Sequence, residues 1–203
     1  MTLLESPQTT AEGFAAARQA MIDSQLRTSG VTEVNTIARM RAVPREDFVP
    51  AAARDFAYMD RAVPLGDGRF LAAPLVNGTM VQEAAPQPHE TAILVDGGSG
   101  YMAEVLRPLV AKLTVLTPAE ALATPRGQGK ADLIVIDGAI EQMPDSLAKR
   151  LADNGRVVTG LVENGITSVA RGRKAGGQIV FLKLAEMGVP RLPEFDKPKG
   201  WSF

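Results

Sequence analysis

The sequence predicts one α/β domain built on an open, mostly parallel sheet in the second half of the chain. Apolar runs at residues 92–95, 113–116, 133–136 and 156–161 alternate there with helical segments at 101–111 and 145–152. Strands that alternate with helices imply right-handed crossovers and parallel pairing. The runs are almost unbroken, which suits strands that are buried on both faces. A chain of 203 residues supports a single core, because domains mostly divide beyond about 200 residues.

The first part of the chain is predicted to be helical. Thr9 and Glu12 have the spacing of a capping box, and apolar residues then recur at helical intervals until Gly30. A second helix is predicted at 32–41, and it must stop before Pro44, because proline disfavours helical geometry in the residue that precedes it. A short third helix is expected from about residue 50.

Residues 58–74 contain prolines and glycines between apolar pairs, so we expect an irregular or hairpin-like loop there. Loops of this length are often functional. Near the other end, two strands at 178–184 and after Val189 are predicted to form an antiparallel edge. The domain thus divides into a helical and loop region at 1–88, a sheet region at 89–190 and a tail at 191–203, whose Trp201 and Phe203 are expected to dock on the body or on a second subunit.

The composition argues against several classes of function. The 22 basic and 23 acidic side chains leave a net charge of −1, so no overall field attracts nucleic acid or an anionic membrane. The best basic cluster (Arg171, Arg173 and Lys174) is interpreted as a solvated helix end. The absence of cysteine excludes disulfides and thiolate metal sites. Because the start of the chain is not typical of a signal peptide and no apolar run approaches about 20 residues, we expect a cytoplasmic protein with neither membrane nor nucleic-acid partners.

A glycine-rich loop follows the first predicted strand of the sheet. The sequence Asp96-Gly-Gly-Ser-Gly-Tyr101 comes directly before a helix, so its backbone can approach a ligand and the helix N–H groups can face an anion. In doubly wound sheets such loops border the ligand cleft. A turn that only joins a strand to a helix explains the loop equally well. Gly98, Gly100 and Ala103, with Glu120 downstream, also satisfy the loose pattern of a dinucleotide site.

Six stretches carry a resemblance to a known family. They are Met21-Ile-Asp-Ser-Gln-Leu-Arg27, Met40-Arg-Ala-Val-Pro-Arg45, Phe48-Val-Pro50, Ala57-Tyr-Met-Asp-Arg61 with Pro64-Leu-Gly66, Gly98-Ser-Gly-Tyr101, and Asn154-Gly-Arg-Val-Val158. In this order they resemble the protein-L-isoaspartate O-methyltransferase family, over a region from Ala16 to the C-terminus. Each stretch is short, but their combination in one order is specific.

The resemblance implies the Rossmann-like open sheet of a class I methyltransferase, mostly parallel with an antiparallel edge and an N-terminal helical extension. It also implies S-adenosyl-L-methionine as cofactor and proteins or peptides with L-isoaspartyl residues as substrates, methylated on the α-carboxylate. A carboxylate is already nucleophilic and a sulfonium already activated, so the protein mainly positions the two and excludes water. By resemblance, the cofactor-binding positions are Asp96, Gly97, Gly98, Ser99, Gly100, Thr117 and Asp137, and the catalytic positions are Asp60 and Ala72.

Several of these positions differ from the family. Ala72 stands where the family has a serine, so the hydroxyl is lost, and Asp96 stands at the first glycine of the family loop. Thr117 replaces the acid on the cofactor ribose, a loss of about 1–3 kcal/mol if buried donors are left unpaired. Residues 118–132 are too few for the third strand and its crossover, so this strand is predicted to be missing. Asp137 stands where the family has a hydroxyl residue.

Asp96 and Asp137 each precede a glycine at the end of a predicted strand. Two carboxylates that face one cleft could bind a cation, a metal or the sulfonium and amine of the cofactor. Because Asp-Gly is a favoured turn pair, we favour two separate turn caps and no metal site. Asp60 either lines the substrate side or forms a buried salt bridge with Arg61 or Arg45. His89 is predicted to be a surface loop residue.

Three functions remain open at this stage. The first is a methyltransferase of this family that retains donor binding and methyl transfer. The second is a non-catalytic binding or scaffold protein on the same fold, and the third, more distant, is a nicotinamide-dependent enzyme. The replacements gather in one cleft, which favours weakened or lost activity. The oligomeric state is not predicted.

Overall fold

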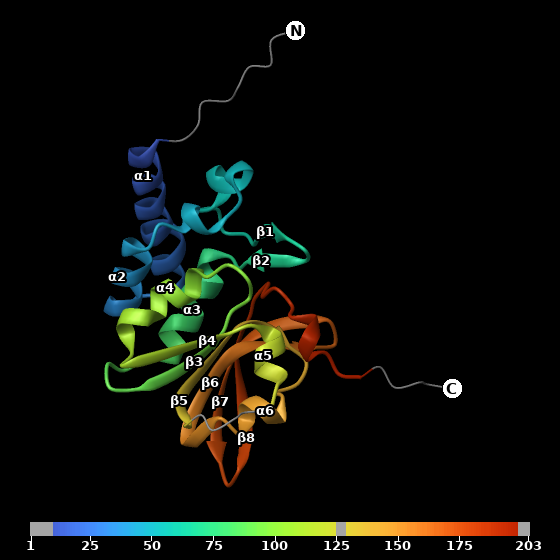
Figure 1. Ribbon diagram of the computed structural model, residues 1–203. Coiled ribbons are helices and arrows are strands. Elements are labelled where there is room, and N and C mark those ends of the chain that lie inside the picture. The colour runs from blue at the N-terminus through green and yellow to red at the C-terminus, as the bar shows by residue number, and fades with distance from the viewer. Residues whose placement is uncertain (1–9, 125–128, 199–203) are drawn as a thin grey trace.

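The helices and the short hairpin formed by residues 11–84 pack against one face of the sheet (Figure 1). A computed structural model describes residues 10–124 and 129–198. The elements are α1 (Ala11–Met21), η1 (Ile22–Leu26), η2 (Arg27–Ser29), α2 (Val34–Ala42), η3 (Arg45–Phe48), η4 (Ala51–Phe56), β1 (Val63–Gly66), β2 (Arg69–Leu71) and α3 (Pro74–Ala84). Thr10 caps α1 by accepting the Gly13 N–H, and the helical run ends at Gly30, as predicted. Thr9 lies outside the described residues.

The second part of the chain forms the sheet. Its elements are β3 (Thr91–Val95), α4 (Tyr101–Leu106), η5 (Arg107–Leu109), β4 (Lys112–Leu116), α5 (Pro118–Leu122), β5 (Ala131–Ile140), α6 (Asp145–Ala148), β6 (Leu151–Glu163), β7 (Ile166–Ala175), β8 (Gln178–Glu186) and η6 (Pro193–Phe195). The strand order is β4-β3-β5-β6-β7-β8. The first four strands are parallel, and β7 and β8 are antiparallel. The predicted fold class, a mostly parallel sheet with an antiparallel edge, is confirmed.

One margin of the sheet is formed by β4. In the described part of the chain, only the five-residue helix α5 lies between β4 and β5. No strand lies beyond β4 within residues 10–124 and 129–198. The described residues therefore agree with the predicted loss of the third strand, and β4 becomes an edge strand.

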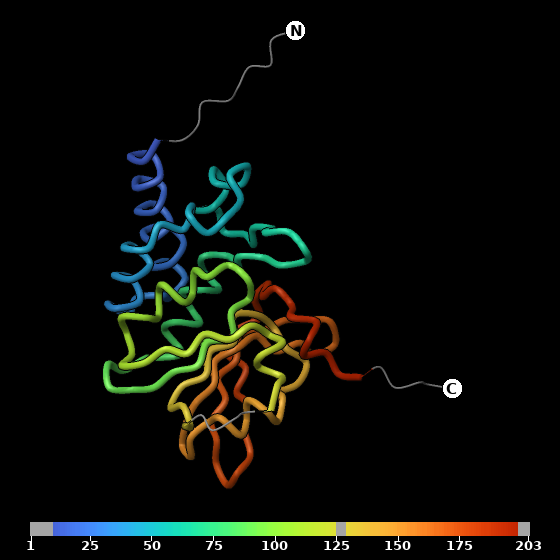
Figure 2. Tube along the Cα trace, in the orientation of Figure 1, coloured from blue at the N-terminus to red at the C-terminus, as the bar shows by residue number. Residues whose placement is uncertain are grey.

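The sheet separates two cores, because neighbouring residues of a strand point to opposite faces. Leu94, Leu133 and Val135 contribute to the larger core, under the N-terminal helices, α3 and α4. Ile93 and Ile134 contribute to the smaller core, which α5, α6 and the C-terminal segment (residues 189–196) cover. Figure 2 shows this segment running along the side of the sheet. Within the described residues, no helix is long and apolar enough to span a membrane.

Two predictions about the antiparallel edge are wrong. The antiparallel partner of β8 is β7, the strand before it, because Gly176 and Gly177 have φ of +59° and +81° and make a tight hairpin turn between the two strands. Between Val189 and residue 198, where the described part of the chain ends, the backbone forms an isolated bridge between Ala139 and Arg191 and no strand. The basic cluster of residues 171–174 consequently lies on β7 and not at a helix end.

Candidate functional site

The glycine loop lies at the carboxyl edge of the sheet, between β3 and α4. The two carboxylate oxygens of Asp96 accept hydrogen bonds from the Gly98 and Gly100 N–H groups, each at 3.0 Å. Gly98 and Gly100 have φ of +112° and +74°, a region that favours glycine. Ser99 Oγ accepts the Tyr101 N–H at 3.1 Å. Asp96 thus caps its own turn and engages two amides that would otherwise face a ligand.

Arg69, from β2, covers the outer face of Gly98. A Cβ placed on Gly98 would lie 3.2 Å from Arg69 Cγ and 3.3 Å from Arg69 Cβ. The Arg69 guanidinium forms an ion pair with Glu194 of η6, and the two side chains are 28% and 29% exposed. The hairpin β1–β2 and the C-terminal segment therefore meet over the glycine loop, as their adjacent paths in Figure 1 indicate.

Asp137 is the second carboxylate at this edge of the sheet. Its side chain is buried, and its Oδ1 accepts a hydrogen bond of 3.4 Å from Asn77 Nδ2 of α3. The pKa of Asp137 is raised to about 7, mainly by burial and to a smaller extent by repulsion from Asp96. The positive charge of Arg45 and the hydrogen bond from the Gly97 N–H act in the opposite direction. The interpretation of Asp137 as a cap of its own turn is wrong, because Asp137 lies inside β5.

Gly97 packs directly on the backbone of Asp137. A Cβ at Gly97 would lie 2.2 Å from the Asp137 carbonyl oxygen, far inside van der Waals contact. Only glycine permits this approach of loop and strand. The loop and β5 are therefore in close backbone contact and together form the floor of the candidate site.

Arg45 joins the N-terminal region to this floor. Its side chain is fully buried, and its nitrogens donate to the carbonyls of Ala57 and Ala72 and to Asn77 Oδ1. The guanidinium carbon lies 5.1 Å from the centroid of the Tyr101 ring, close enough for a cation–π contact. Burial lowers the pKa of Arg45, and the neighbouring Tyr101 and Asp137 oppose that effect. Asn77 therefore connects the positive charge of Arg45 to the buried carboxyl group of Asp137 by two hydrogen bonds.

Thr117 is at the end of β4, as predicted, but it caps α5. Its Oγ1 accepts the Glu120 N–H at 3.2 Å, and the Glu120 carboxylate accepts both the N–H and the hydroxyl of Thr117. These bonds lower the pKa of Glu120. Glu120 is therefore committed to the start of α5, which removes the acid that the dinucleotide interpretation required.

The two expected catalytic positions differ in burial. Ala72 is buried, and its carbonyl accepts a hydrogen bond from Arg45. Asp60 is exposed, and among the described residues no ion pair joins it to Arg61 or Arg45, so the proposed buried salt bridge is wrong. Asp60 lines a cavity of about 350 Å³ with Ala73, the N-cap of α3, and with residues 186–188 at the end of β8.

Two further observations concern other candidate groups. His89 is exposed in the turn before β3, which confirms the predicted surface position. Among residues 10–124 and 129–198, no cluster of three or more histidine or acidic side chains is arranged to hold a metal ion.

Sequence reasoning missed the groups that close the site. Arg69 and Glu194 are far apart in the chain, so no local pattern in the sequence pairs them. Asn77 lies in α3, a helix that no periodic pattern indicated. Arg45 does belong to a retained stretch, Met40-Arg-Ala-Val-Pro-Arg45, and that signal was available.

A parallel sheet in the order β4-β3-β5-β6, with a glycine loop after its central strand and an antiparallel pair at the far edge, defines a class I methyltransferase fold. A family model described as "Protein-L-isoaspartate(D-aspartate) O-methyltransferase" matches residues 16–121. A protein-L-isoaspartate O-methyltransferase of Herpetosiphon aurantiacus is 33% identical over 165 residues, which cover 70% of this chain and 74% of that protein. The chain belongs to this family, as its motifs predicted.

Other comparisons agree with this assignment. A protein-L-isoaspartate O-methyltransferase of Koribacter versatilis is 29% identical over 203 residues, which cover 88% of this chain and 90% of that protein. A Plasmodium falciparum crystal structure described as a protein-L-isoaspartate O-methyltransferase in complex with S-adenosyl-L-homocysteine superposes with a TM-score of 0.70. It covers 88% of this chain and 98% of its own at 17% identity. At that identity the similarity shows the common fold.

Proposed function

We propose that this chain is an S-adenosylmethionine-dependent carboxyl methyltransferase that acts on L-isoaspartyl residues of proteins or peptides, with weakened affinity for the donor. The loop at residues 96–100 carries the proposal. It keeps positive φ at Gly98 and Gly100 and rests on β5 through Gly97, in a chain whose relatives are named for this reaction. We place the activity in the cytoplasm, with damaged proteins as partners.

The residues beside the loop fit the methionine half of the donor once Arg69 moves. The space next to Gly98 is filled by the aliphatic stem of Arg69, which is flexible and held by a partly exposed ion pair with Glu194. Such pairs stabilise by about 0–1 kcal/mol. A micromolar ligand gains about 8 kcal/mol, so displacement of the stem is a small cost.

The residues near β4 fit the ribose half poorly. The hydroxyl and N–H of Thr117 are already bonded to Glu120. No described strand lies beyond β4 to form a wall for the base. These two features support weakened affinity rather than a different donor.

The roles of the individual residues follow from their positions. When bound, S-adenosylmethionine supplies an activated methyl group. At Gly98 and Gly100, the lack of a side chain would let the donor contact the backbone of the loop. Asp137 has a pKa of about 7, so its protonation state would set the negative charge of β5 below the loop. Arg45 positions the backbone of Ala72 by its hydrogen bond. Asp60 would face the substrate in the cavity beside Ala73.

A methylation assay tests the proposal. Radiolabelled S-adenosylmethionine should label an L-isoaspartyl peptide and leave the matched L-aspartyl peptide unlabelled. Gly98→Val should abolish labelling, because the added side chain would occupy the space beside the loop that the donor needs and is strained at φ +112°. Gly129→Val is the control, since no atom lies within 4 Å of its added Cβ. Labelling by Gly98→Val equal to that of the wild type would contradict the proposed donor site.

One observation favours a second candidate, a non-catalytic binding protein. Asp96 already satisfies the Gly98 and Gly100 amides, so the loop has lost donors that a ligand would use. Calorimetric titration with S-adenosyl-L-homocysteine separates the two candidates. Saturable binding supports the enzyme, whereas absence of binding at millimolar ligand, also in Arg69→Ala, supports the binding protein.

A further inference from the structure

The outer side of β4 is an unpaired strand edge. Its first residue, Lys112, donates its N–H at 3.3 Å to the carbonyl of the residue before β3, and the carbonyl of its last residue, Leu116, accepts the N–H after β3 at 2.9 Å. Because alternate residues of a strand bond to the same neighbour, Leu113 and Val115 direct their backbone groups away from β3. No other strand pairs with β4 in the described residues. Such an edge is a template for an added strand.

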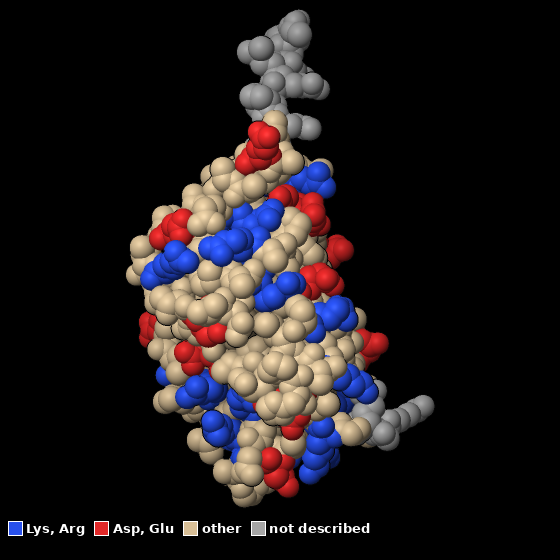
Figure 3. Space-filling model, turned by 90° about the vertical axis from the view of Figure 1, so that its left-hand side faces the viewer, with Lys and Arg blue, Asp and Glu red and all other residues tan. Residues whose placement is uncertain are grey.

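The two faces of this edge differ in chemistry. On the side of the larger core, Val115 is 39% exposed. On the opposite side, Lys112 and Thr114 border a cavity of about 340 Å³ that also contacts Thr91, Ile93 and Ala131. Figure 3, which views the molecule from the left-hand side of Figure 1, shows an uncharged area in the lower half of this face, with basic and acidic side chains on both sides of it.

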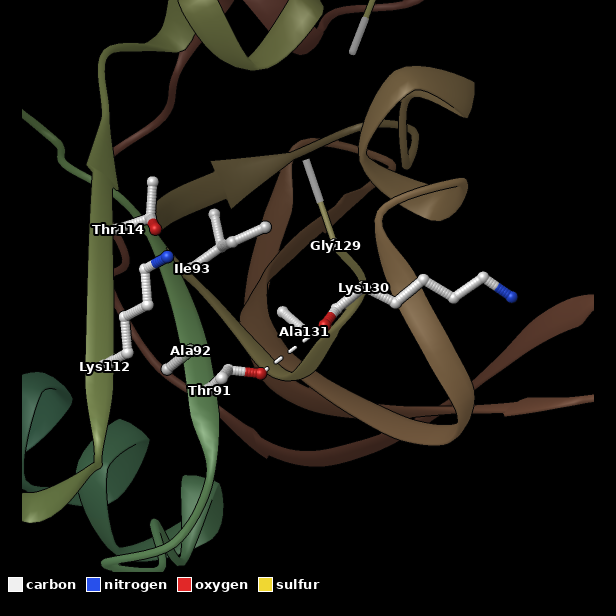
Figure 4. A pocket seen from close by; sticks show the side chains of 8 residues that line it. All are labelled: Thr91, Ala92, Ile93, Lys112, Thr114, Gly129, Lys130 and Ala131. Carbon is white, nitrogen blue, oxygen red and sulfur yellow. Dashed lines mark hydrogen bonds between the residues drawn. The ribbon is translucent and has the colours of Figure 1, made fainter. Parts of the chain in front are cut away.

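The cavity carries an unpaired positive charge. Figure 4 shows the Lys112 ammonium beside Thr114, whereas the Lys130 side chain points away from the cavity, and Lys130 lies 3.8 Å from Asp153. Among the residues that the structure describes, those that line the cavity include no acidic side chain. Among the described residues, the Lys112 ammonium has no ion pair.

We propose that β4 binds an extended acidic segment of a partner protein as an added strand. Side chains of a strand alternate between faces, so acidic residues at every second position would meet Lys112, and β-branched apolar residues between them would cover Val115. A second copy of this chain fits less well, because β4 itself reads Lys112-Leu-Thr-Val-Leu116 and offers no carboxylate. The added strand would take the place beyond β4 that the third strand of the fold would fill.

Fluorescence polarisation with a labelled Glu-Val-Glu-Val-Glu-Val-Glu peptide tests this proposal. We expect saturable binding in the micromolar range, and at least about tenfold weakening in Lys112→Glu, as for loss of a charge-assisted contact. Lys149→Glu makes the same change in charge on the exposed end of α6 and should bind like the wild type. A peptide with lysine in place of glutamate should not bind.

Backbone pairing has its own test. Val115→Pro removes an outward N–H at a position where an edge strand tolerates proline, and it should abolish binding. A peptide with N-methyl groups on alternate residues should also fail to bind, and this needs no change in the protein. Lack of saturable binding, or equal binding by Lys112→Glu or by the N-methylated peptide, would overturn the proposal. Self-association that Val115→Pro removes, seen by sedimentation equilibrium, would assign the edge to a second copy instead.

Discussion

The side chain of Arg69 controls access to the glycine loop. Arg69→Ala removes the stem that lies against Gly98 and breaks the ion pair with Glu194. Because a partly exposed pair is worth about 0–1 kcal/mol, we expect S-adenosyl-L-homocysteine to bind up to about fivefold tighter by calorimetry. Arg191→Ala breaks two exposed ion pairs of the same segment without contacting the loop, and its affinity should not change. Weaker binding by Arg69→Ala would show that Arg69 contacts the ligand.

The buried carboxyl group of Asp137 makes stability depend on pH. Its pKa rises from 3.8 in the unfolded chain to about 7, so the folded state binds more protons between these values. Stability therefore falls as pH rises through this window, and the loss is complete above pH 7. Asp137→Asn removes the charge, and we expect it to raise the melting temperature more at pH 8 than at pH 5. Circular dichroism melts at both pH values measure this.

Asp132 provides a control of opposite sign. The Thr91 N–H donates to its carboxylate at 2.9 Å and lowers its pKa. Its stabilisation is present above the unfolded pKa and is lost as pH falls, so Asp132→Asn should destabilise the protein at neutral pH. An Asp137→Asn effect of equal size at pH 5 and pH 8 would contradict the buried titration.

Single residues were predictable where the interaction is local. Asp96 and its two amides lie within the loop itself, so the turn chemistry of Asp-Gly was sufficient to predict the cap. The same rule failed at Asp137, because the extent of β5 depends on its pairing with β6. The contact of Arg69 with Gly98 depends on how the hairpin and the C-terminal segment fold over the sheet, which no local pattern encodes.

The contact between the loop and β5 sets the geometry at the scale of elements. Gly97→Ala would put a Cβ 2.2 Å from the Asp137 carbonyl, so the loop must move away from the strand. Such overpacking costs about 1–3 kcal/mol, and urea unfolding should show a loss in this range. Gly188→Ala, where no atom lies within 4 Å of the added Cβ, should change stability by less than about 0.5 kcal/mol. Equal midpoints for the two variants would contradict the tight contact.

Elements were predictable where burial is continuous along the chain. The strands β3 to β6 contain long apolar runs, whereas β7 combines Val169 and Ala170 with Arg171, Arg173 and Lys174 and so fails an apolar-run criterion. Its hairpin signal, Asn164-Gly165, was nevertheless present in the sequence. The helix α3 was missed for a different reason: most of its residues are buried, so no polar face produces a helical period.

The whole molecule depends on the C-terminal segment to close its smaller core. Leu192 and Phe195 are 2% and 1% exposed, and a Cβ at Gly138 would lie 2.5 Å from Leu192 Cγ, so the segment packs directly on β5. The family fold could be predicted from motifs in other parts of the chain. The closure of the smaller core by the C-terminal segment could not be predicted, because the apolar residues of this segment lie singly between prolines and show neither strand nor helix periodicity.

Phe195→Ala tests the role of this segment. Removal of a fully buried ring costs about 3–5 kcal/mol, so urea unfolding should show a loss of this size. Phe56→Ala, whose ring is 40% exposed, should cost much less. Glu194 is next to Phe195 and holds Arg69 over Gly98. Loss of the Phe195 ring should therefore also weaken the hold of Glu194 on Arg69. We expect Phe195→Ala to bind S-adenosyl-L-homocysteine as tightly as Arg69→Ala does. A destabilised variant with wild-type affinity would separate the closure of the core from the closure of the loop.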